Sequence, residues 1–374
     1  MKIRSAVVTA AVLATALFAQ VNPAAAAGKE NIKVVKNFAY TGGTDLDFSG
    51  NLIYAGRQGA EGGVGIYRGG KNPKQVGFVN CPGDQNDVAV VKPGLLAIGA
   101  HSSQCTKFKA GVGLFDVKNP KRPKFLSDVG LPGGTHTLTV YPGKPIIYAS
   151  PGGLANGGSV EQILDASNPK KLKVAATFKP NQAGCHDVTF SFKKGRKLAF
   201  CAGLTEVQIW DVKDPLKPVT IGRIASPTFF PHSAVATPDG KYVIVGDEAF
   251  GVHDCVGGVT GSMYAYDIST PEVPLLVGHF GPPRGATPAG TFVTDWCTAH
   301  NYNFIPGTRI MVASWYTGGT NVIDWTNPTL PVEIAYFQPE DADTWSSYWH
   351  KGHIYANDLN RGLDVLKINK LGEG

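Results

Sequence analysis

The sequence has 374 residues, among them 46 glycines, 26 prolines and 6 cysteines, and its formal net charge is +6 at pH 7. This composition and the many short apolar runs favour strands joined by tight turns, and they exclude a fold built from long helices. The basic residues are scattered and form no run interleaved with aromatic residues, so the charge pattern argues against a nucleic-acid-binding surface.

The first 27 residues have the pattern of a signal peptide. Lys2 and Arg4 form a basic start, an apolar stretch continues to Phe18, and small residues at 24–27 offer cleavage sites. We therefore expect residues 1–27 to be removed on export and residues 28–374 to form one secreted or cell-surface domain. No later stretch approaches the ~18 consecutive apolar residues of a membrane-spanning helix, so we expect no transmembrane segment.

After this leader, one short strand element recurs along the chain, and its final aspartate is followed four residues later by a proline. The plain copies are Val112–Asp116, Glu161–Asp165, Val207–Asp211, Met263–Asp267 and Thr320–Asp324. Two degenerate copies, Val64–Arg68 and Leu363–Lys367, end in a basic residue instead. Successive aspartates are 49, 46, 56 and 57 residues apart, which fits a four-stranded propeller blade of about 45 residues with insertions in two places.

Within each unit, an inner strand, a tight turn and a second strand precede the strand with the aspartate. A turn rich in asparagine, aspartate and proline then leads to a fourth strand. We assign the repeated aspartates to these turns, where their carboxylates accept backbone N–H bonds.

Seven units predict an all-β fold, a seven-bladed β-propeller with four-stranded blades. Closing the ring removes the exposed sheet edges that an open row of blades would leave. The last unit ends at its third strand, whereas an unassigned strand precedes the first unit. We therefore expect Ile32 to Phe38 to pair with Leu363 to Ile368 and to complete the seventh blade.

The strand element, its aspartate and the following Asn-Pro or Asp-Pro together resemble the LVIVD repeat of exported bacterial propeller proteins. The resemblance covers most of residues 28–374 and is best in Val207 to Pro218 and Met263 to Pro274. Arg68 and Lys367 depart from it only in the first and last copies. The resemblance implies the propeller architecture and export, and it implies no particular activity.

Two insertions lengthen the repeat, one from Asp247 to Gly261 and one from Gly281 to Cys297. By their positions within the units, both emerge on the same face of a propeller. An even number of cysteines in an exported chain favours disulfides, and antiparallel neighbours place strand ends within the ~5.5 Å that a bridge needs. The predicted pairs are Cys81 with Cys105, Cys185 with Cys201, and Cys255 with Cys297. These bridges would either preserve the shape of a functional surface or protect long loops from proteolysis.

Four histidines occupy equivalent positions at the start of the inner strand in units three to six. They are His136, His186, His232 and His300. Equivalent positions in a ring converge on its axis, so we expect four imidazoles at the channel mouth on the insertion-bearing face. Neutral imidazole is the commonest protein ligand of transition metals, and a nitrogen-rich site suits copper or zinc. The alternative is a structural role, in which the histidines hold loops through hydrogen bonds to neighbouring blades.

Further candidate ligands on that face come from loops and strand starts and show no ligand spacing along the chain. They are His101, His253, Asp87, Asp187, Glu248, Asp295 and Asp358.

The favoured function is a binding or scaffold module whose insertion-bearing face meets a protein or small-molecule ligand. The alternative is a metal-dependent oxidoreductase, with copper among the candidate metals. Selenium-binding and methanethiol-oxidase proteins also use propellers with histidine-rich sites, a likeness of architecture without a shared motif. A propeller lactonase would need several acidic ligands where this sequence has mainly histidine. No hydrolase elbow, Walker loop, dinucleotide fingerprint or His-Glu-x-x-His motif occurs, so whether the protein is an enzyme stays open.

Overall fold

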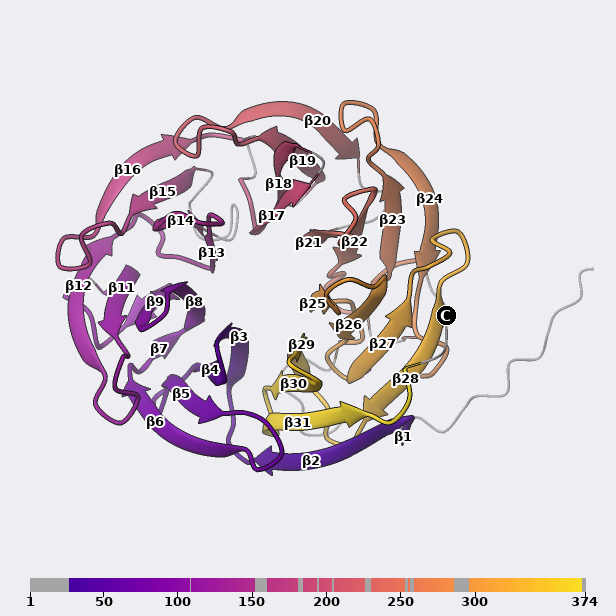
Figure 1. The fold of residues 1–374 in the computed structure, drawn as a ribbon, viewed down its shortest axis with the longest axis horizontal. Coiled ribbons are helices and arrows are strands. Elements are labelled where there is room, and N and C mark those ends of the chain that lie inside the picture. The colour runs from indigo at the N-terminus through magenta and orange to yellow at the C-terminus, as the bar shows by residue number, and fades with distance from the viewer. Residues whose placement is uncertain are drawn as a thin grey trace, which may run out of the picture.

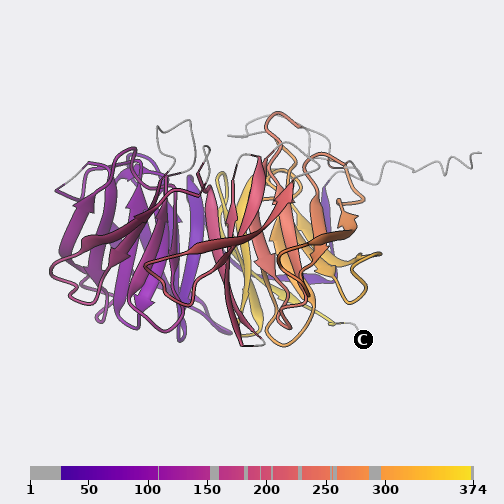
Figure 2. The same cartoon turned by 90° about the horizontal axis from the view of Figure 1, so that it is seen from above.

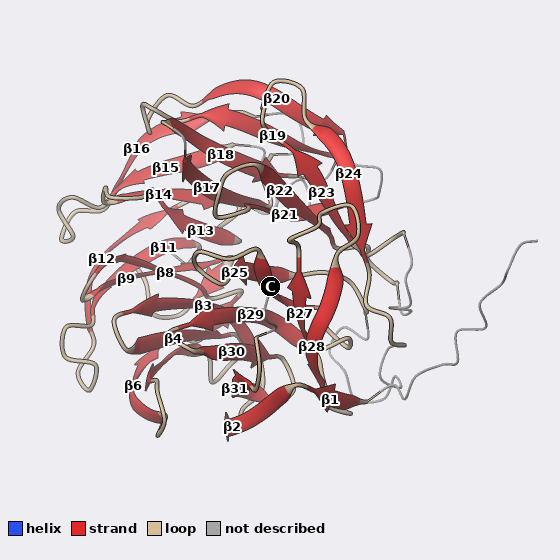
Figure 3. Cartoon of the chain, turned by 45° about the vertical axis from the view of Figure 1, so that its right-hand side comes forward, coloured by secondary structure: helices blue, strands red, loops and turns tan. Residues whose placement is uncertain are grey.

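The computed structural model describes residues 27–107, 109–151, 160–180, 184–193, 195–203, 205–225, 230–252, 255, 259–285 and 296–371. The regular elements in these ranges are all strands, which surround a central axis (Figure 1) and are drawn in red in Figure 3. Among the described residues there is no helix long and apolar enough to cross a membrane.

The described strands form seven blades of four strands each, which confirms the predicted fold class. Blade 1 consists of β3 (Gly43–Ser49), β4 (Leu52–Arg57), β5 (Gly63–Arg68) and β6 (Lys74–Asn80). Blade 2 consists of β8 (Asp87–Lys92), β9 (Leu95–Ala100), β11 (Gly111–Asp116) and β12 (Lys124–Gly130). Blade 3 consists of β13 (Thr137–Val140), β14 (Ile146–Ser150), β15 (Glu161–Asp165) and β16 (Lys173–Phe178). Blade 4 consists of β17 (Asp187–Lys193), β18 (Arg196–Ala202), β19 (Glu206–Asp211) and β20 (Val219–Ala225).

The remaining blades follow the same order. Blade 5 consists of β21 (Pro231–Ala236), β22 (Tyr242–Asp247), β23 (Met263–Asp267) and β24 (Leu275–Phe280). Blade 6 consists of β25 (Asn301–Phe304), β26 (Ile310–Ser314), β27 (Thr320–Asp324) and β28 (Val332–Gln338). Blade 7 consists of β29 (Thr344–His350), β30 (His353–Asp358), β31 (Gly362–Ile368) and, from the other end of the chain, β2 (Ile32–Phe38). A small ribbon of β7 (Gly83–Asp84) and β10 (Ser102–Ser103) accompanies blade 2.

The ring closes as the sequence predicts. Strand β2 pairs antiparallel with β31, from Ile32 opposite Ile368 to Phe38 opposite Leu363. A second closure was not predicted: β1 (Gly28–Glu30) adds to the outer edge of β28 in blade 6. Because β25 and β29 also pair in parallel, blades 6 and 7 form one nine-stranded sheet with the N-terminal segment at both of its outer edges.

The hydrophobic core lies between adjacent blades rather than at the centre of the ring. Ile209 of blade 4, for example, belongs to one buried cluster with Val243 and Tyr264 of blade 5. Seen from the side, the blades form a thick disc with loops on both faces (Figure 2). The axis is therefore free of a packed apolar core and is lined by the inner strands.

The repeated aspartates cap the turns that follow them, as expected. In all five plain copies the carboxylate accepts a hydrogen bond from the backbone N–H two residues later, at 2.7–3.0 Å. The turn then contacts the preceding blade. An added Cβ on Gly222 of blade 4 would lie 2.0 Å from the Pro271 carbonyl oxygen of blade 5. An added Cβ on Gly278 of blade 5 would likewise lie 2.1 Å from the Pro328 carbonyl oxygen of blade 6.

This close approach predicts that Gly222→Ala lowers the free energy of unfolding by ~1–3 kcal/mol, because a methyl group would overlap a backbone oxygen that cannot rotate away. Urea unfolding followed by circular dichroism measures the change. The matched control is Gly285→Ala, where nothing lies within 4 Å of the added Cβ, and its stability should stay within ~0.5 kcal/mol of the parent. Equal effects of the two substitutions would contradict the proposed contact between blades.

A candidate metal centre at the channel

The four predicted histidines lie at equivalent points of their blades. His136, His186 and His300 each directly precede the inner strand, and each backbone N–H bonds to the last residue of the second strand, at 2.6–3.0 Å. His232 is the second residue of β21, where the pairing with β22 shifts register between Pro231 and Ser233. Such bulges re-aim side chains and are common beside active sites.

The imidazoles form a continuous row. Ring centroids are 4.2 Å apart for His136 and His186, 4.2 Å for His186 and His232, and 4.0 Å for His232 and His300. His101, which directly follows β9, extends the row and stacks 5.0 Å from His136. The convergence expected from the repeat register is therefore present.

One carboxylate approaches the row. Glu248 follows β22, and its two oxygens lie 3.7 Å from His232 Nε2 and 3.6 Å from His300 Nε2. These three side chains are at most 5% exposed. The imidazole nitrogens of His186 and His232 and a Glu248 oxygen all lie within 4.8 Å of one another, and this is the one such group among the described residues.

Burial fixes the protonation states of the row. It lowers the pKa of His186 and of His300 to about 3, and neighbouring histidines add to the effect. The pKa values of His136 and His232 also lie well below the usual range for the same reason. The imidazoles are therefore neutral at pH 7, the form in which histidine binds metals. Burial also raises the pKa of Glu248 to about 8.

The tautomer of His300 follows from its partner. Its Nδ1 lies 2.6 Å from the Trp345 carbonyl oxygen, which can only accept, so Nδ1 carries the hydrogen. A lone pair on Nε2 therefore faces a Glu248 oxygen, an arrangement that needs either a proton or a cation between the two atoms. Nδ1 of His136, His186 and His232 has no hydrogen-bond partner although each is buried. Such orphaned acceptors and donors are costly unless a ligand satisfies them.

Tyr316 holds the carboxylate in place. Its hydroxyl donates to Glu248 at 2.6 Å, and its ring lies 4.7 Å from that of His300. The Tyr316 backbone has φ of +45°, which a bulky residue adopts only under strain, and two backbone hydrogen bonds with Thr344 hold it there. Strain of this kind clusters at functional sites, and here it directs the hydroxyl at the carboxylate.

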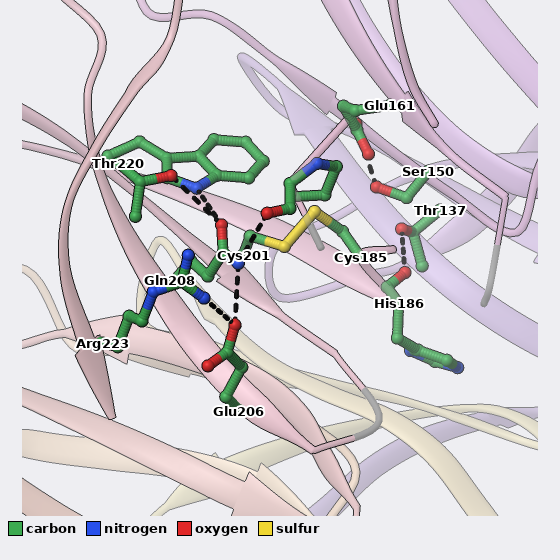
Figure 4. Close-up of a disulfide and its surroundings, with 12 residues drawn as sticks. Thr137, Ser150, Glu161, Cys185, His186, Cys201, Glu206, Gln208, Thr220 and Arg223 are labelled. Carbon is green, nitrogen blue, oxygen red and sulfur yellow. Dashed lines mark hydrogen bonds and ion pairs between the residues drawn. A yellow bond between two sulfur atoms is a disulfide. The ribbon is translucent and has the colours of Figure 1, made fainter. Parts of the chain in front are cut away.

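All three predicted disulfides are present, and one of them lies next to the cluster. Cys81 is bonded to Cys105, Cys185 to Cys201, and Cys255 to Cys297, the pairs that the strand positions predict. Cys185 directly precedes His186, whose carbonyl accepts a 2.6 Å hydrogen bond from the Thr137 hydroxyl of blade 3 (Figure 4). The bridge and this contact between blades fix the backbone that carries His186.

The other predicted candidates separate into three groups. Asp87 and Asp187 line the central cavity, and His101 ends the row with Nδ1 3.9 Å from Asp84. Asp358 instead accepts hydrogen bonds from Asp343, Thr344, Asn360 and Arg361 and so closes a turn of blade 7. His253 and Asp295 lie outside the described residues.

The central cavity has a volume of about 800 Å³, within the range of small-molecule sites. Inner strands of several blades form its wall. His136, His232 and His300 line it together with Asp45, Asp87 and Trp345. A molecule in the cavity would therefore contact residues of the row.

A chain of aromatic rings begins beside His186. The ring centroid of Phe230 lies 5.0 Å from that of His186 and 5.0 Å from that of Phe250. The Phe250 centroid lies 5.1 Å from that of Trp296. Phe230 and Phe250 could not be predicted from the sequence, because neither repeats between blades and no motif marks them. Phe230 is buried and places an apolar ring beside His186, which strengthens electrostatic interactions there.

A second buried glutamate, Glu161, lies at the start of β15 and contacts Ser150 of β14 (Figure 4). Ser150 donates to one of its oxygens at 3.0 Å, and the other has no hydrogen-bond partner. Burial raises the pKa of Glu161 to about 8. Because the folded protein then holds a proton that the unfolded chain releases near pH 4.5, stability from this group is complete below about pH 4.5 and is lost as the pH rises to about 8.

We therefore expect Glu161→Gln to stabilise the protein by roughly 2–4 kcal/mol at pH 8.5 and to have little effect at pH 4. Chemical unfolding at the two pH values measures the difference. A substitution effect that is the same at both would show that Glu161 does not hold its proton on folding.

No known family model matches the chain, and no curated protein sequence matches it. The structure itself shows the propeller and the cluster of histidines with Glu248. Kinship with the LVIVD-repeat proteins stays a prediction from the repeat element.

Proposed function

We propose that the protein is an exported propeller that binds one transition-metal ion at His186, His232 and Glu248 and presents it to a small molecule in the central cavity. One observation carries the proposal. Two neutral imidazoles and a carboxylate, all buried, bring their ligand atoms within 4.8 Å of one another. Ligands bound at 2.0–2.2 Å around one ion lie roughly 3–4 Å apart, so small movements of these side chains close the site.

His300 supplies a fourth donor. Its Nδ1–H bond to the Trp345 carbonyl directs Nε2 at Glu248, and this kind of outer hydrogen bond fixes the tautomer of metal-binding histidines in proteins. The Tyr316 hydroxyl does the same for Glu248. A nitrogen-rich set with one carboxylate suits zinc, copper or iron. The ion would act as a Lewis acid, and copper or iron would in addition exchange electrons.

The row of histidines also bears on the structural alternative. A histidine that only holds a loop should use its ring nitrogens for hydrogen bonds, whereas Nδ1 of His136, His186 and His232 has no such partner. Metal binding accounts better for these three rings. Among the functions considered, a metal-dependent oxidoreductase thus has more support than a pure scaffold.

Export, kinship with LVIVD-repeat proteins and a partner for the insertion-bearing face also belong to the proposal. Three disulfides support an oxidising location. The insertions offer less support for a partner, since 256–258 and 286–295 lie outside the described residues.

Titration of chelator-treated protein with Co²⁺, followed by visible absorption, tests the site. We expect a saturable spectrum at about one Co²⁺ per chain, with the strong bands typical of a tetrahedral nitrogen and oxygen site, and its displacement by Zn²⁺. Copper or iron in the protein as isolated would support the oxidoreductase, and zinc would contradict the redox part. The absence of saturable Co²⁺ binding would overturn the metal centre.

A further inference from the structure

Two aspartates, one partly buried and one buried, line the central cavity apart from the metal centre. Asp45 belongs to β3 of blade 1, Asp87 begins β8 of blade 2, and both line the cavity. Their carboxyl groups are in hydrogen-bond contact with each other. Two carboxylates in contact repel each other strongly when both are ionised, so the pair holds at least one proton and can carry one negative charge.

The surrounding donors place that charge on Asp45. Its Oδ1 accepts hydrogen bonds from Ser346 at 2.7 Å, Tyr348 at 2.8 Å and Asn301 at 3.3 Å. Hydrogen bonds to the ionised form favour it. Asp87 accepts backbone hydrogen bonds from Val88 and Leu138, and burial beside Asp45 keeps its pKa well above the usual range.

Lys92 and Lys144 also line the cavity, but neither forms an ion pair with Asp45 or Asp87. Within the described ranges, no lysine or arginine forms an ion pair with any of the four aspartates that line the cavity, Asp45, Asp47, Asp87 and Asp187. A buried charge without a counter-ion is costly, which favours a cationic ligand. The described carboxylates of the cavity form no group of three with metal-ligand spacing, so an organic cation fits this part of the cavity better than a second metal ion.

A second feature of the cavity points to an organic ligand. His232, which is 1% exposed, also lines the cavity; its Nε2 lies 3.7 Å from Glu248, and its buried Nδ1 has no hydrogen-bond partner. Trp345 and Tyr348 add two aromatic rings to the wall, and the Tyr348 hydroxyl already bonds Asp45. A carboxylate flanked by aromatic rings is a favourable setting for an ammonium group.

We propose that the cavity binds a small protonated amine with an apolar body, its ammonium group on the Asp45–Asp87 pair and its body toward the histidine row. As the substrate class of the metal centre, this inference rests on the proposed function. Binding of the amine itself does not require the metal, so the two proposals can fail separately.

The test compares three probes of equal size and different charge: benzylamine, benzyl alcohol and benzoate. Isothermal titration calorimetry is performed at pH 7 on the folded protein, both metal-free and metal-loaded. We expect benzylamine to bind at least tenfold more tightly than the other two in both forms. Equal affinities, or preference for benzoate, would overturn the inference.

Variants locate the charge that is responsible. Asp45→Asn removes the negative charge of the pair, and the preference for benzylamine should fall to less than about threefold. Asp87→Asn leaves the charge on Asp45, because the amide imitates the protonated carboxyl group, and should keep most of the preference. Asp116→Asn on an exposed turn is the control and should keep the full preference. If Asp45→Asn fails to fold, the probe series with the parent protein still decides, and full preference in a folded Asp45→Asn variant would contradict the site.

The outcomes separate the two proposals. Selective binding of benzylamine by a protein that takes up no metal would support the amine site and overturn the metal centre. Metal uptake without any charge preference among the probes would support the metal centre and overturn the amine site.

Discussion

Replacing Glu248 with glutamine is expected to weaken metal binding by at least ~100-fold, because the site loses the carboxylate that offsets the charge of the ion. His232→Ala should have an effect of the same size, since it removes a nitrogen that lies 3.7 Å from Glu248. Competition with a chelator of known affinity, such as a zinc indicator dye, measures both changes.

Two further substitutions make this result specific. Tyr316→Phe removes only the hydroxyl that orients Glu248 and should weaken binding by ~10-fold. His279→Ala removes an exposed histidine of β24 and should change nothing. If Glu248→Gln bound metal as tightly as the parent protein, or if His279→Ala lost it equally, the ion would be bound elsewhere.

Deleting residues 28–38 is expected to destroy the cooperative fold or to lower the melting temperature by more than ~10 °C. The deletion removes the outer strand of blade 7 and exposes the edge of β31, which reopens the ring. It also removes β1 from blade 6 and Asn31 between them, whose side chain bonds the Ile334 and Lys370 carbonyls at 3.1 and 2.7 Å. Differential scanning calorimetry measures the loss.

The matched control starts the chain at residue 28 and keeps both strands. Its melting temperature should equal that of the 374-residue chain. A chain that lacks 28–38 and still melts at the same temperature would show that ring closure does not depend on the N-terminal segment.

Much of the fold could be predicted because the sequence repeats itself. The aspartate and proline of each unit fix the register, so blade number, the pairing of β2 with β31 and the three disulfides all follow from position. The addition of β1 to β28 could not be predicted in this way. It depends on three residues, 28–30, that have no counterpart in any repeat.

The site could be predicted only in part for the same reason. The repeat register brings His136, His186, His232 and His300 together, as expected. Glu248 was one candidate among several loop residues, and its role depends on the bulge at His232 and on the left-handed backbone of Tyr316. Asp358 was an equally good candidate ligand in the sequence, yet its carboxylate accepts backbone hydrogen bonds and closes a turn. The spacing of residues along the chain does not predict in which direction a loop side chain points.

The most direct test of the account is the metal content of the protein purified from the cells that produce it naturally. Mass spectrometry of the elements, with protein quantified by amino-acid analysis, gives the number of ions per chain. We predict about one copper, zinc or iron ion per chain in the native protein and less than a tenth of that in Glu248→Gln prepared in parallel. A native protein without a transition metal, or a Glu248→Gln variant with the same content, would contradict the account.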